Sequence, residues 1–351
     1  MLKAKETTLE RNVPAVKLEN DKVEITILPD KGADIYQWIH KGTGVDVMWK
    51  SPWGLRKPGA GIPTSFDSSV TWIEWYPGGW QVLFPSGGGP CHYKGVELSF
   101  HGEASSMFWD VADLGSNEHE AWVRLTTTLA RSPFTLTRDI VLDKDATSFL
   151  LRETVRNDAG EPMDYVWGHH PAYGAPFLSE DCRIDTNART LRADDVYDPP
   201  TCPWTPGTVY RWPTTERDGA TADLSVVPGI GEARGSMGYL EDFDEIAWYG
   251  ITNTRLGIGA GLAWRTEDFP YAWFWQELHA SPGFPWYKRV YVMAIEPSTT
   301  NVGQGLVAAI EKNGSHRTLQ PGESRTAEIR AVLYDATTGI SGIDMDGNVR
   351  S

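Results

Sequence analysis

The chain has 351 residues, of which 40% are hydrophobic, and it carries a formal net charge of -15. This length and apolar content allow a large folded core. Phosphate binding requires clustered Lys and Arg, so an acidic chain of this kind is not expected to bind nucleic acid. No apolar run approaches the ~18 residues of a membrane-spanning helix, and the amino terminus lacks a secretory apolar stretch. We therefore expect a cytoplasmic protein without a membrane partner.

The three cysteines, Cys91, Cys182 and Cys202, are far apart in the sequence. Their number and spacing fit neither a disulfide framework nor a C-x-x-C metal knuckle. We expect no bound metal and no cofactor.

Strand patterns dominate the chain. Apolar and polar residues alternate with a period of two, and short Gly, Pro, Asn and Asp turns separate the runs. The predicted strands are 23–27, 123–129, 134–142, 148–155, 164–170, 245–251, 256–264, 271–278, 288–295 and 324–334. No long helical pattern and no βαβ alternation appears. The pattern predicts an all-β fold, a single large antiparallel β-sandwich domain covering residues 1–351.

The stretch from Asp194 to Gly229 differs from the rest because turn-forming residues crowd it. We expect a long surface excursion, and its length favours a lid or an interface over a linker between domains.

Two adjacent histidines, His169 and His170, end the predicted strand that begins at Asp164. Neighbouring residues on a strand point to opposite faces, so only one of them can face a given cleft. Pro171 fixes the backbone just after His170, which favours His170 as the working residue, and His169 becomes a nearby contact. The alternative is a structural histidine pair.

Two other polar positions lie at strand ends among aromatic residues. His101 and Glu103 follow Phe100, and Glu296 ends the apolar run that begins at Tyr291. A carboxylate entering an apolar neighbourhood must be paired, hydrogen-bonded or changed in proton affinity. Together with the histidine pair, these positions indicate a histidine–carboxylate site.

The 16 tryptophans point to a ligand class. Several lie beside Gly and Pro, with Trp72, Trp75 and Trp80 in one cluster and Trp273, Trp275 and Trp286 in another. Flat aromatic faces in loops can stack on the C–H patches of a sugar ring, although tryptophan also fills large sheet cores.

Five short motifs resemble those of the aldose 1-epimerase family, the galactose mutarotase-like sugar epimerases, and they occur in the family's order. They are Gly32–Ile35, Phe100–Gly102, Gly168–Tyr173, Ala294–Pro297 and Leu319–Glu323. The family's Asn-Arg segment before the first histidine is absent, and Gly78–Pro85 takes its place. The chain therefore resembles a divergent branch of the family.

The resemblance implies a galactose mutarotase-like β-sandwich that interconverts the anomers of an aldose. It implies that Glu296 is the general base, that His170 is the general acid, and that His101 is a donor to the sugar. A carboxylate and a histidine suit proton transfer near neutral pH, and each contributes roughly 10²–10⁴-fold to the rate. No nucleophile or cofactor is needed.

In place of the missing arginine segment, we expect at least one of Trp72, Trp75 and Trp80 to stack on the sugar. Glu277, which lies near the end of a predicted strand, is a further candidate contact.

Two other functions fit parts of the sequence. A non-catalytic sugar-binding β-sandwich would use the tryptophans without needing Glu296. A metal-dependent sugar isomerase would use His101, Glu103 and His170 as ligands.

Overall fold

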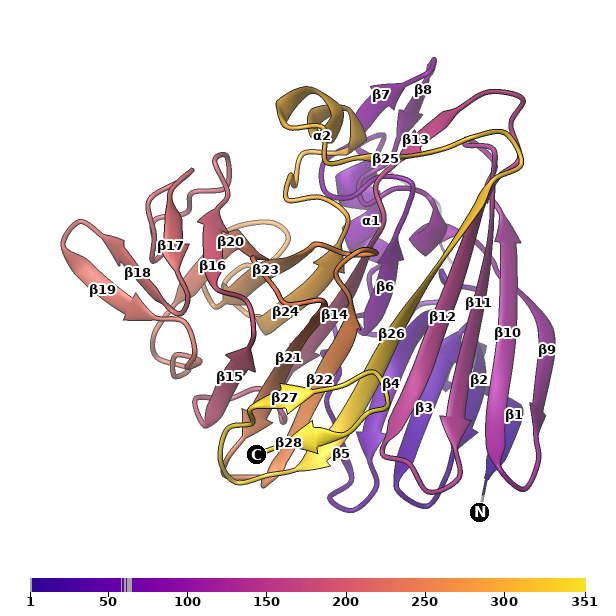
Figure 1. Cartoon of the computed structure of the whole chain (residues 1–351), viewed down its shortest axis with the longest axis horizontal. Coiled ribbons are helices and arrows are strands. Elements are labelled where there is room, and N and C mark those ends of the chain that lie inside the picture. Colours follow the sequence, from indigo (N-terminus) through magenta and orange to yellow (C-terminus); the bar gives the residue numbers. More distant parts are fainter. Residues whose placement is uncertain (1, 58, 60, 62–64) are drawn as a thin grey trace.

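A computed structural model describes residues 2–57, 59, 61 and 65–351 (Figure 1). β-strands dominate these residues, and two short α-helices, α1 (Ser68–Trp75) and α2 (Leu306–Lys312), lie outside the sheets. Two 3-10 turns cover Glu10–Asn12 and Ala104–Ser106. Within the described part of the chain, no helix combines the length and the apolar character that crossing a membrane would require.

The larger of the two main sheets has the order β1-β2-β3-β4-β6-β14-β24-β23-β20-β16-β17, with β5 paired to β4. Its strands are β1 (Lys3–Thr8), β2 (Pro14–Glu19), β3 (Val23–Leu28), β4 (Asp34–His40), β5 (Val45–Asp46), β6 (Trp80–Leu83), β14 (Gly168–Gly174), β16 (Thr190–Ala193), β17 (Val209–Arg211), β20 (Arg234–Glu241), β23 (Tyr271–Leu278) and β24 (Tyr291–Ser298).

The second sheet has the order β15-β21-β22-β26-β12-β11-β10-β9. Its strands are β9 (Asp110–Ser116), β10 (Glu120–Thr128), β11 (Phe134–Asp143), β12 (Ser148–Asn157), β15 (Cys182–Thr186), β21 (Ile246–Asn253), β22 (Ile258–Arg265) and β26 (Ser324–Asp335). Short pairs complete the described structure, namely β7 (Cys91–Tyr93) with β8 (Val96–Leu98), β13 (Met163–Tyr165) with β25 (Arg317–Leu319), β18 (Thr214–Arg217) with β19 (Ala220–Asp223), and β27 (Gly342–Ile343) with β28 (Val349–Arg350).

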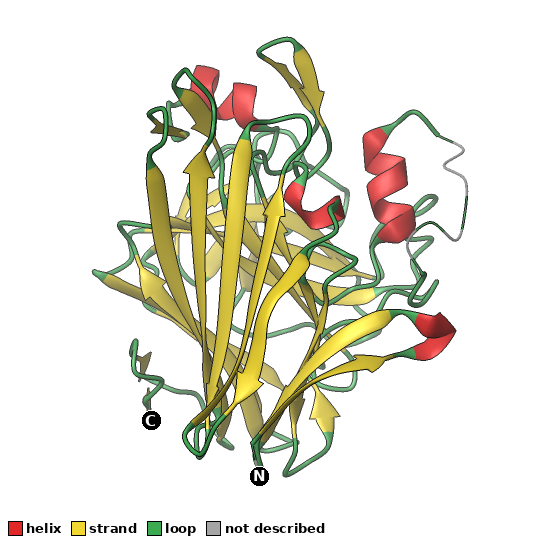
Figure 2. Ribbon diagram, turned by 90° about the vertical axis from the view of Figure 1, so that its right-hand side faces the viewer, coloured by secondary structure: helices red, strands yellow, loops and turns green. Residues whose placement is uncertain are grey.

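The two main sheets pack against each other, and one large apolar cluster draws buried side chains from both. Figure 2 shows the long strands from the side, with the helices at their ends and edges. All strand pairs of the two main sheets are antiparallel, for example β11 with β12 and β23 with β24. The predicted all-β sandwich is therefore confirmed.

Strand β11 shows why these residues form a sandwich. Its side chains alternate between buried and half-exposed positions, and Phe134, Leu136, Ile140 and Leu142 enter the core. The same alternation forces Arg138 inward, where it is 1% exposed. A buried guanidinium needs partners, and the next strand supplies one.

That partner is Glu153 of β12, which lies directly opposite Arg138 in the register. The Arg138 guanidinium contacts Glu153 Oε1 at 2.5 Å and donates to the Ala33 carbonyl. His169 and Trp167 contact Glu153 Oε2 at 3.2 and 3.0 Å. Because Ala33 and His169 belong to the larger sheet region, this buried network ties the two sheets together.

Strand β14 differs from the expectation at Pro171. The sequence suggested that this proline would end the strand, but the strand continues to Gly174. Its pairing with β24 is recorded at Gly168–Ser298 and again from Ala172–Ala294 onward. Pro171 lies between these two points, where the pairing with β24 does not require a backbone N–H from this residue. The predicted segment is also divided in two, since Met163–Tyr165 pairs with β25 instead.

The expected surface excursion is only partly on the surface. The hairpin of β18 and β19 projects at the left of Figure 1. In contrast, Cys202, Trp204 and Leu224 join the main core, and Trp204 is fully buried. The excursion is therefore anchored by its own apolar residues.

We predict that Glu153→Gln lowers the free energy of unfolding by about 3–5 kcal/mol, because it leaves the Arg138 charge buried without its counter-ion. Chemical denaturation measures this change. Glu328→Gln is the matched control, since it breaks the exposed Arg152–Glu328 pair of the same sheet and should cost about 0–1 kcal/mol. Equal effects of the two substitutions would contradict the role given to the buried network.

The same network predicts a dependence of stability on pH. Burial acts to raise the pKa of Glu153, but the charges of Arg138 and His169 and their hydrogen bonds outweigh it and lower the pKa to about 2. A lowered carboxyl pKa contributes stability that is fully present above the ordinary value of 4.5 and is lost as the pH falls toward 2. The acid loss of stability should be smaller in Glu153→Gln than in the unmodified protein.

Candidate active site

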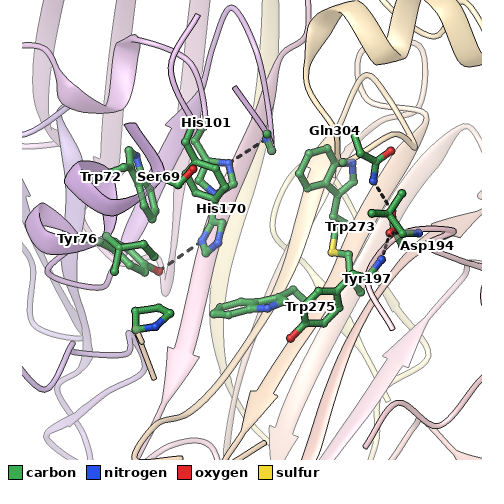
Figure 3. Close-up of a pocket in the computed structure, with 18 of the residues that line it drawn as sticks. Ser69, Trp72, Tyr76, His101, His170, Asp194, Tyr197, Trp273, Trp275 and Gln304 are labelled. Carbon is green, nitrogen blue, oxygen red and sulfur yellow. Dashed lines mark hydrogen bonds between the residues drawn. The ribbon is translucent and has the colours of Figure 1, made fainter. Parts of the chain in front are cut away.

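A cavity of about 630 Å³ lies over the middle of the larger sheet. Its floor comes from β14, β24, β23 and β20, while α1 and the loops around residues 88 and 285 form its walls. Figure 3 shows His101, His170, Trp72 and Tyr76 on one side, and Asp194, Tyr197 and Gln304 on the other. The cavity therefore contains the histidine–carboxylate candidates and many aromatic faces.

Glu296 and His170 face each other across neighbouring strands. The register that pairs Gly168 with Ser298 and Ala172 with Ala294 sets His170 opposite Glu296. His170 Nε2 lies 3.8 Å from Glu296 Oε1, which is too long for a hydrogen bond. Oε2 of Glu296 has no hydrogen-bond partner among the described residues. The carboxyl group thus keeps its hydrogen-bonding capacity for a ligand.

Burial shifts the proton affinities of this pair in opposite directions. It raises the pKa of Glu296 well above the usual range of a carboxyl group. It lowers the pKa of His170 to about 4, although a backbone hydrogen bond partly opposes the shift. Burial therefore favours the uncharged form of each group, which is the carboxylic acid of Glu296 and the neutral imidazole of His170.

His101 is held with its Nε2 available to a ligand. The backbone N–H of Gly88 donates to His101 Nδ1 at 3.1 Å, so Nδ1 is an acceptor and the hydrogen of the neutral ring is on Nε2. Burial, aided by His170 and Lys31, lowers the pKa of His101 well below its usual range. The ring is therefore a neutral hydrogen-bond donor on the cavity wall.

The backbone at His101 is in the left-handed region, with φ at 60°. Gly102 follows at φ 78°, and a Cβ there would lie 2.4 Å from the Phe84 carbonyl oxygen. Such conformations are uncommon for residues other than glycine and persist where the surroundings enforce them. This sharp turn brings His101 within 5.6 Å of His170, measured between ring centres.

Aromatic residues surround the two histidines. Trp72 of α1 packs on His101 with ring centres 4.6 Å apart, and its Nε1 donates to Ser105 Oγ at 3.0 Å. The hydroxyl of Tyr76 lies 3.5 Å from His170 Nδ1. Burial, together with the charges of Glu296 and Asp34, raises the pKa of Tyr76 well above its usual value, so the hydroxyl stays protonated. Trp275 of β23 also borders His170, and their ring centres are 5.6 Å apart.

The structure places two of the expected substrate contacts in the core instead of the cavity. Trp80 is 1% exposed, and its Nε1 donates to His169 Nδ1 at 3.2 Å. His169 points to the face of β14 opposite His170, where its Nε2 meets Glu153. Strand alternation explains this placement, because β14 separates the core from the cavity.

Two further expected contacts also lie outside the cavity lining. Trp75 lines a separate hollow with Phe66 and Phe108. Glu277 is fully buried and accepts hydrogen bonds from the backbone of Ala280 and Ser281 at 2.9 and 2.8 Å. Of the three tryptophans named from sequence, only Trp72 borders the cavity.

Glu103 does not face the histidines as the metal-site alternative required. Its Oε1 accepts from the backbone of Ala130 and Arg131 at 2.7 and 2.9 Å, and its Oε2 accepts from Ser132. Among the described residues, no group of three or more His, Cys, Asp and Glu is placed to hold a metal ion.

Several cavity residues were not identified from sequence. They are Tyr76, Asp194, Tyr197 and Gln304, whereas Trp273, Trp275 and Trp286 of the second tryptophan cluster also line the cavity. Tyr76 and Asp194 carry no local motif, because they reach the cavity through a helix end and a loop that fold over distant strands. Alternation along β23 would have placed Trp273 and Trp275 on one face.

Comparison with known proteins gives a family and a fold. A family model described as a domain of unknown function (DUF4432) matches residues 10–332. The chain belongs to this family. No curated protein matches the chain.

Solved structures show that the fold is galactose mutarotase-like. A candidate aldose 1-epimerase from Klebsiella pneumoniae is similar with a TM-score of 0.70 and 18% identity, covering 95% of this chain and 84% of that one. A galactose mutarotase-like protein from Clostridium acetobutylicum has a TM-score of 0.67 and 16% identity, covering 95% and 99%. A galactose mutarotase related enzyme from Lactobacillus acidophilus has a TM-score of 0.61 and 17% identity, covering 92% and 98%. At these identities the chain is a divergent branch of the fold.

We predict opposite effects on stability for two buried glutamates. Glu296→Gln should leave the melting temperature unchanged or raise it, because Oε2 of the buried carboxyl group has no hydrogen-bond partner in the described part of the chain. Glu277→Gln is the matched control and should cost about 1–3 kcal/mol, because its amide oxygen accepts the two backbone hydrogen bonds more weakly than a carboxylate and its N–H₂ replaces the acceptor of the Ser281 hydroxyl. Thermal melting by circular dichroism measures both changes. A large loss of stability in Glu296→Gln would show that Glu296 is a structural residue.

Proposed function

We propose that this protein is a sugar 1-epimerase that interconverts the anomers of an aldose by opening and reclosing its ring. The observation that carries the proposal is the buried Glu296 carboxyl group, which lies 3.8 Å from His170 and has one oxygen that no described residue hydrogen-bonds. Buried polar groups are normally satisfied, and exceptions concentrate at functional sites. A sugar bearing both a hydroxyl and a ring oxygen would satisfy this pair.

The pair can perform the proton transfers that ring opening needs. One group removes the hydrogen of the anomeric hydroxyl while the other protonates the ring oxygen. The resemblance assigned these roles to Glu296 as base and His170 as acid. We propose the reverse order for the first step, with His170 as base and Glu296 as acid, because burial favours the protonated carboxyl group and the neutral imidazole.

Ring opening moves the proton from one member of the pair to the other. Reclosure after rotation about the bond between C1 and C2 then uses the two groups in the reverse sense and restores the starting state. Tyr76 supports the base role if His170 Nδ1–H donates to its oxygen, which leaves Nε2 free on the side of Glu296. His101 Nε2–H supplies a neutral donor to a sugar oxygen.

We predict that Glu296→Gln and His170→Asn each lower the rate of anomer exchange by about 10²–10⁴-fold. The double variant should lose much less than the product of the two, because both groups act on one transition state. Exchange spectroscopy by NMR on a panel of neutral aldoses measures the rates. His169→Asn should instead act mainly on stability, because His169 faces the core network.

A folded Glu296→Gln protein with the full exchange rate would contradict the mechanism. An unmodified protein that binds sugars without accelerating their exchange would instead establish a carbohydrate-binding sandwich.

The rate should also depend on acid pH. As the pH falls through about 4, His170 takes up a second proton for the pair, and no base remains for the anomeric hydroxyl. The enzymatic part of the exchange rate should therefore decrease below about pH 4, after the rate of the sugar alone is subtracted. Far-ultraviolet circular dichroism at each pH separates this decrease from unfolding. A flat profile through this range in a folded protein would contradict the base role of His170.

A further inference from the structure

The floor of the cavity continues well beyond the proposed reaction centre. Glu296 pairs with Trp273 on β23, and Trp273 pairs with Tyr239 on β20. With His170 opposite Glu296, these four residues form one row across the sheet. Directly paired residues of an antiparallel sheet face the same side. The row therefore runs from the reaction centre towards Asp194, which accepts a hydrogen bond from the Tyr239 hydroxyl.

The length of this row exceeds that of a single sugar ring. Neighbouring strands are ~4.8 Å apart, so the three steps from β14 to β20 cover ~14 Å. One strand spacing is close to the width of one pyranose ring. The cavity volume of about 630 Å³ also lies in the range of ~300–1,000 Å³ that holds drug-sized ligands, which are larger than one monosaccharide.

The side chains at the far end of the cavity are held in place by hydrogen bonds. This end is formed by Trp273, Met237, Tyr197, Asp194 and Gln304. Trp273 is fixed because its Nε1 donates to the Thr300 carbonyl at 2.6 Å, and it borders the cavity with only 3% of its surface exposed. Asp194 is 2% exposed. It accepts from the backbone of Val196 and Tyr197 and from Gln304 Nε2 at 2.8 Å.

Hydrogen-bonding capacity remains at this end. The Tyr197 hydroxyl has only a long contact of 3.5 Å, to Ser281 Oγ. An aromatic face beside an available hydroxyl is the combination that suits a sugar ring, which has apolar C–H patches and a rim of hydroxyl groups. Figure 3 shows this end separated from His101 and His170, with Trp275 below.

The charge of the lining selects against anionic ligands. Asp67, Asp194 and Glu296 line the cavity, and its described lining contains no Lys or Arg. A phosphate or carboxylate group buried here would lack a charged partner and would be costly. A neutral sugar carries no such penalty.

We propose that the cavity binds a neutral reducing disaccharide. Its reducing ring lies at His170 and Glu296, and its second ring lies over Trp273 and Met237, within reach of Tyr197. A disaccharide joined through the oxygen opposite the anomeric carbon has the direction of the row, because its second ring extends away from the reacting carbon. The placement of the reducing ring rests on the proposed function, whereas the placement of the second ring rests on the cavity alone.

The test compares maltose, cellobiose and lactose with glucose, which is the reducing ring of all three. Calorimetry measures binding and NMR exchange measures kcat/KM. At least one disaccharide should exceed glucose by about tenfold or more in both. Met237→Trp, which fills the far end of the cavity, should reduce the ratio of disaccharide to glucose by about tenfold. Met237→Leu conserves volume and should keep the ratio.

The inference is overturned if glucose binds as well as every disaccharide, if glucose 6-phosphate binds more tightly than glucose, or if Met237→Trp leaves the ratio unchanged. These outcomes are separate from a failure of the proposed function. If no sugar shows accelerated exchange, the epimerase proposal fails, while the calorimetric comparison of disaccharide with glucose and of Met237→Trp with Met237→Leu still decides whether the second ring is bound.

Discussion

The buried network around Arg138 and Glu153, two neighbours in the second sheet, joins that sheet to the larger one. Glu153 also receives His169 of β14, and Arg138 reaches the Ala33 carbonyl beside β4. A buried ion pair stabilises only when its remaining hydrogen-bonding groups find partners, and here most of those partners come from the other sheet. The network therefore fixes β14 from its core side. His170 lies on the other side of the same strand, at the cavity floor, so fixing the backbone of β14 also fixes the position of His170.

On the cavity side of β14, in contrast, a buried polar group is left without a hydrogen-bond partner among the described residues. Glu296 is buried, lacks a partner at Oε2 and lies beyond hydrogen-bond distance from His170. An arrangement of this kind costs stability and is retained where a ligand or a reaction uses it. Glu277, on the neighbouring strand, shows how the same residue type looks when it is structural, since loop donors satisfy its carboxylate. Both glutamates are buried, so burial does not distinguish them. They differ in the number of hydrogen-bond partners of their carboxyl groups.

Fold similarity and site chemistry support different parts of the functional argument. The galactose mutarotase-like fold is shared by proteins of low identity to this chain, and a fold alone does not set an activity. The proposal of anomer interconversion depends on Glu296, His170 and His101 at one end of the cavity. The proposal of a two-ring neutral ligand depends on the residues at the other end, Trp273, Met237 and Tyr197, and on a described lining without Lys or Arg. The two ends can therefore be tested separately.

The period of two in the apolar residues was sufficient to predict the strands and the all-β sandwich. The reason is that side chains alternate between the two faces of a strand, which depends only on neighbouring residues in the sequence. It also predicted that His169 and His170 face opposite sides of the strand, and His170 lies in the cavity wall. Sequence could not separate Trp72 from Trp80, and it named both Glu296 and Glu277 as site candidates without showing which of them has hydrogen-bond partners. Only the tertiary structure decided between them, since burial against the second sheet, the fold of α1 over distant strands and the supply of backbone donors are all set by contacts between segments far apart in sequence.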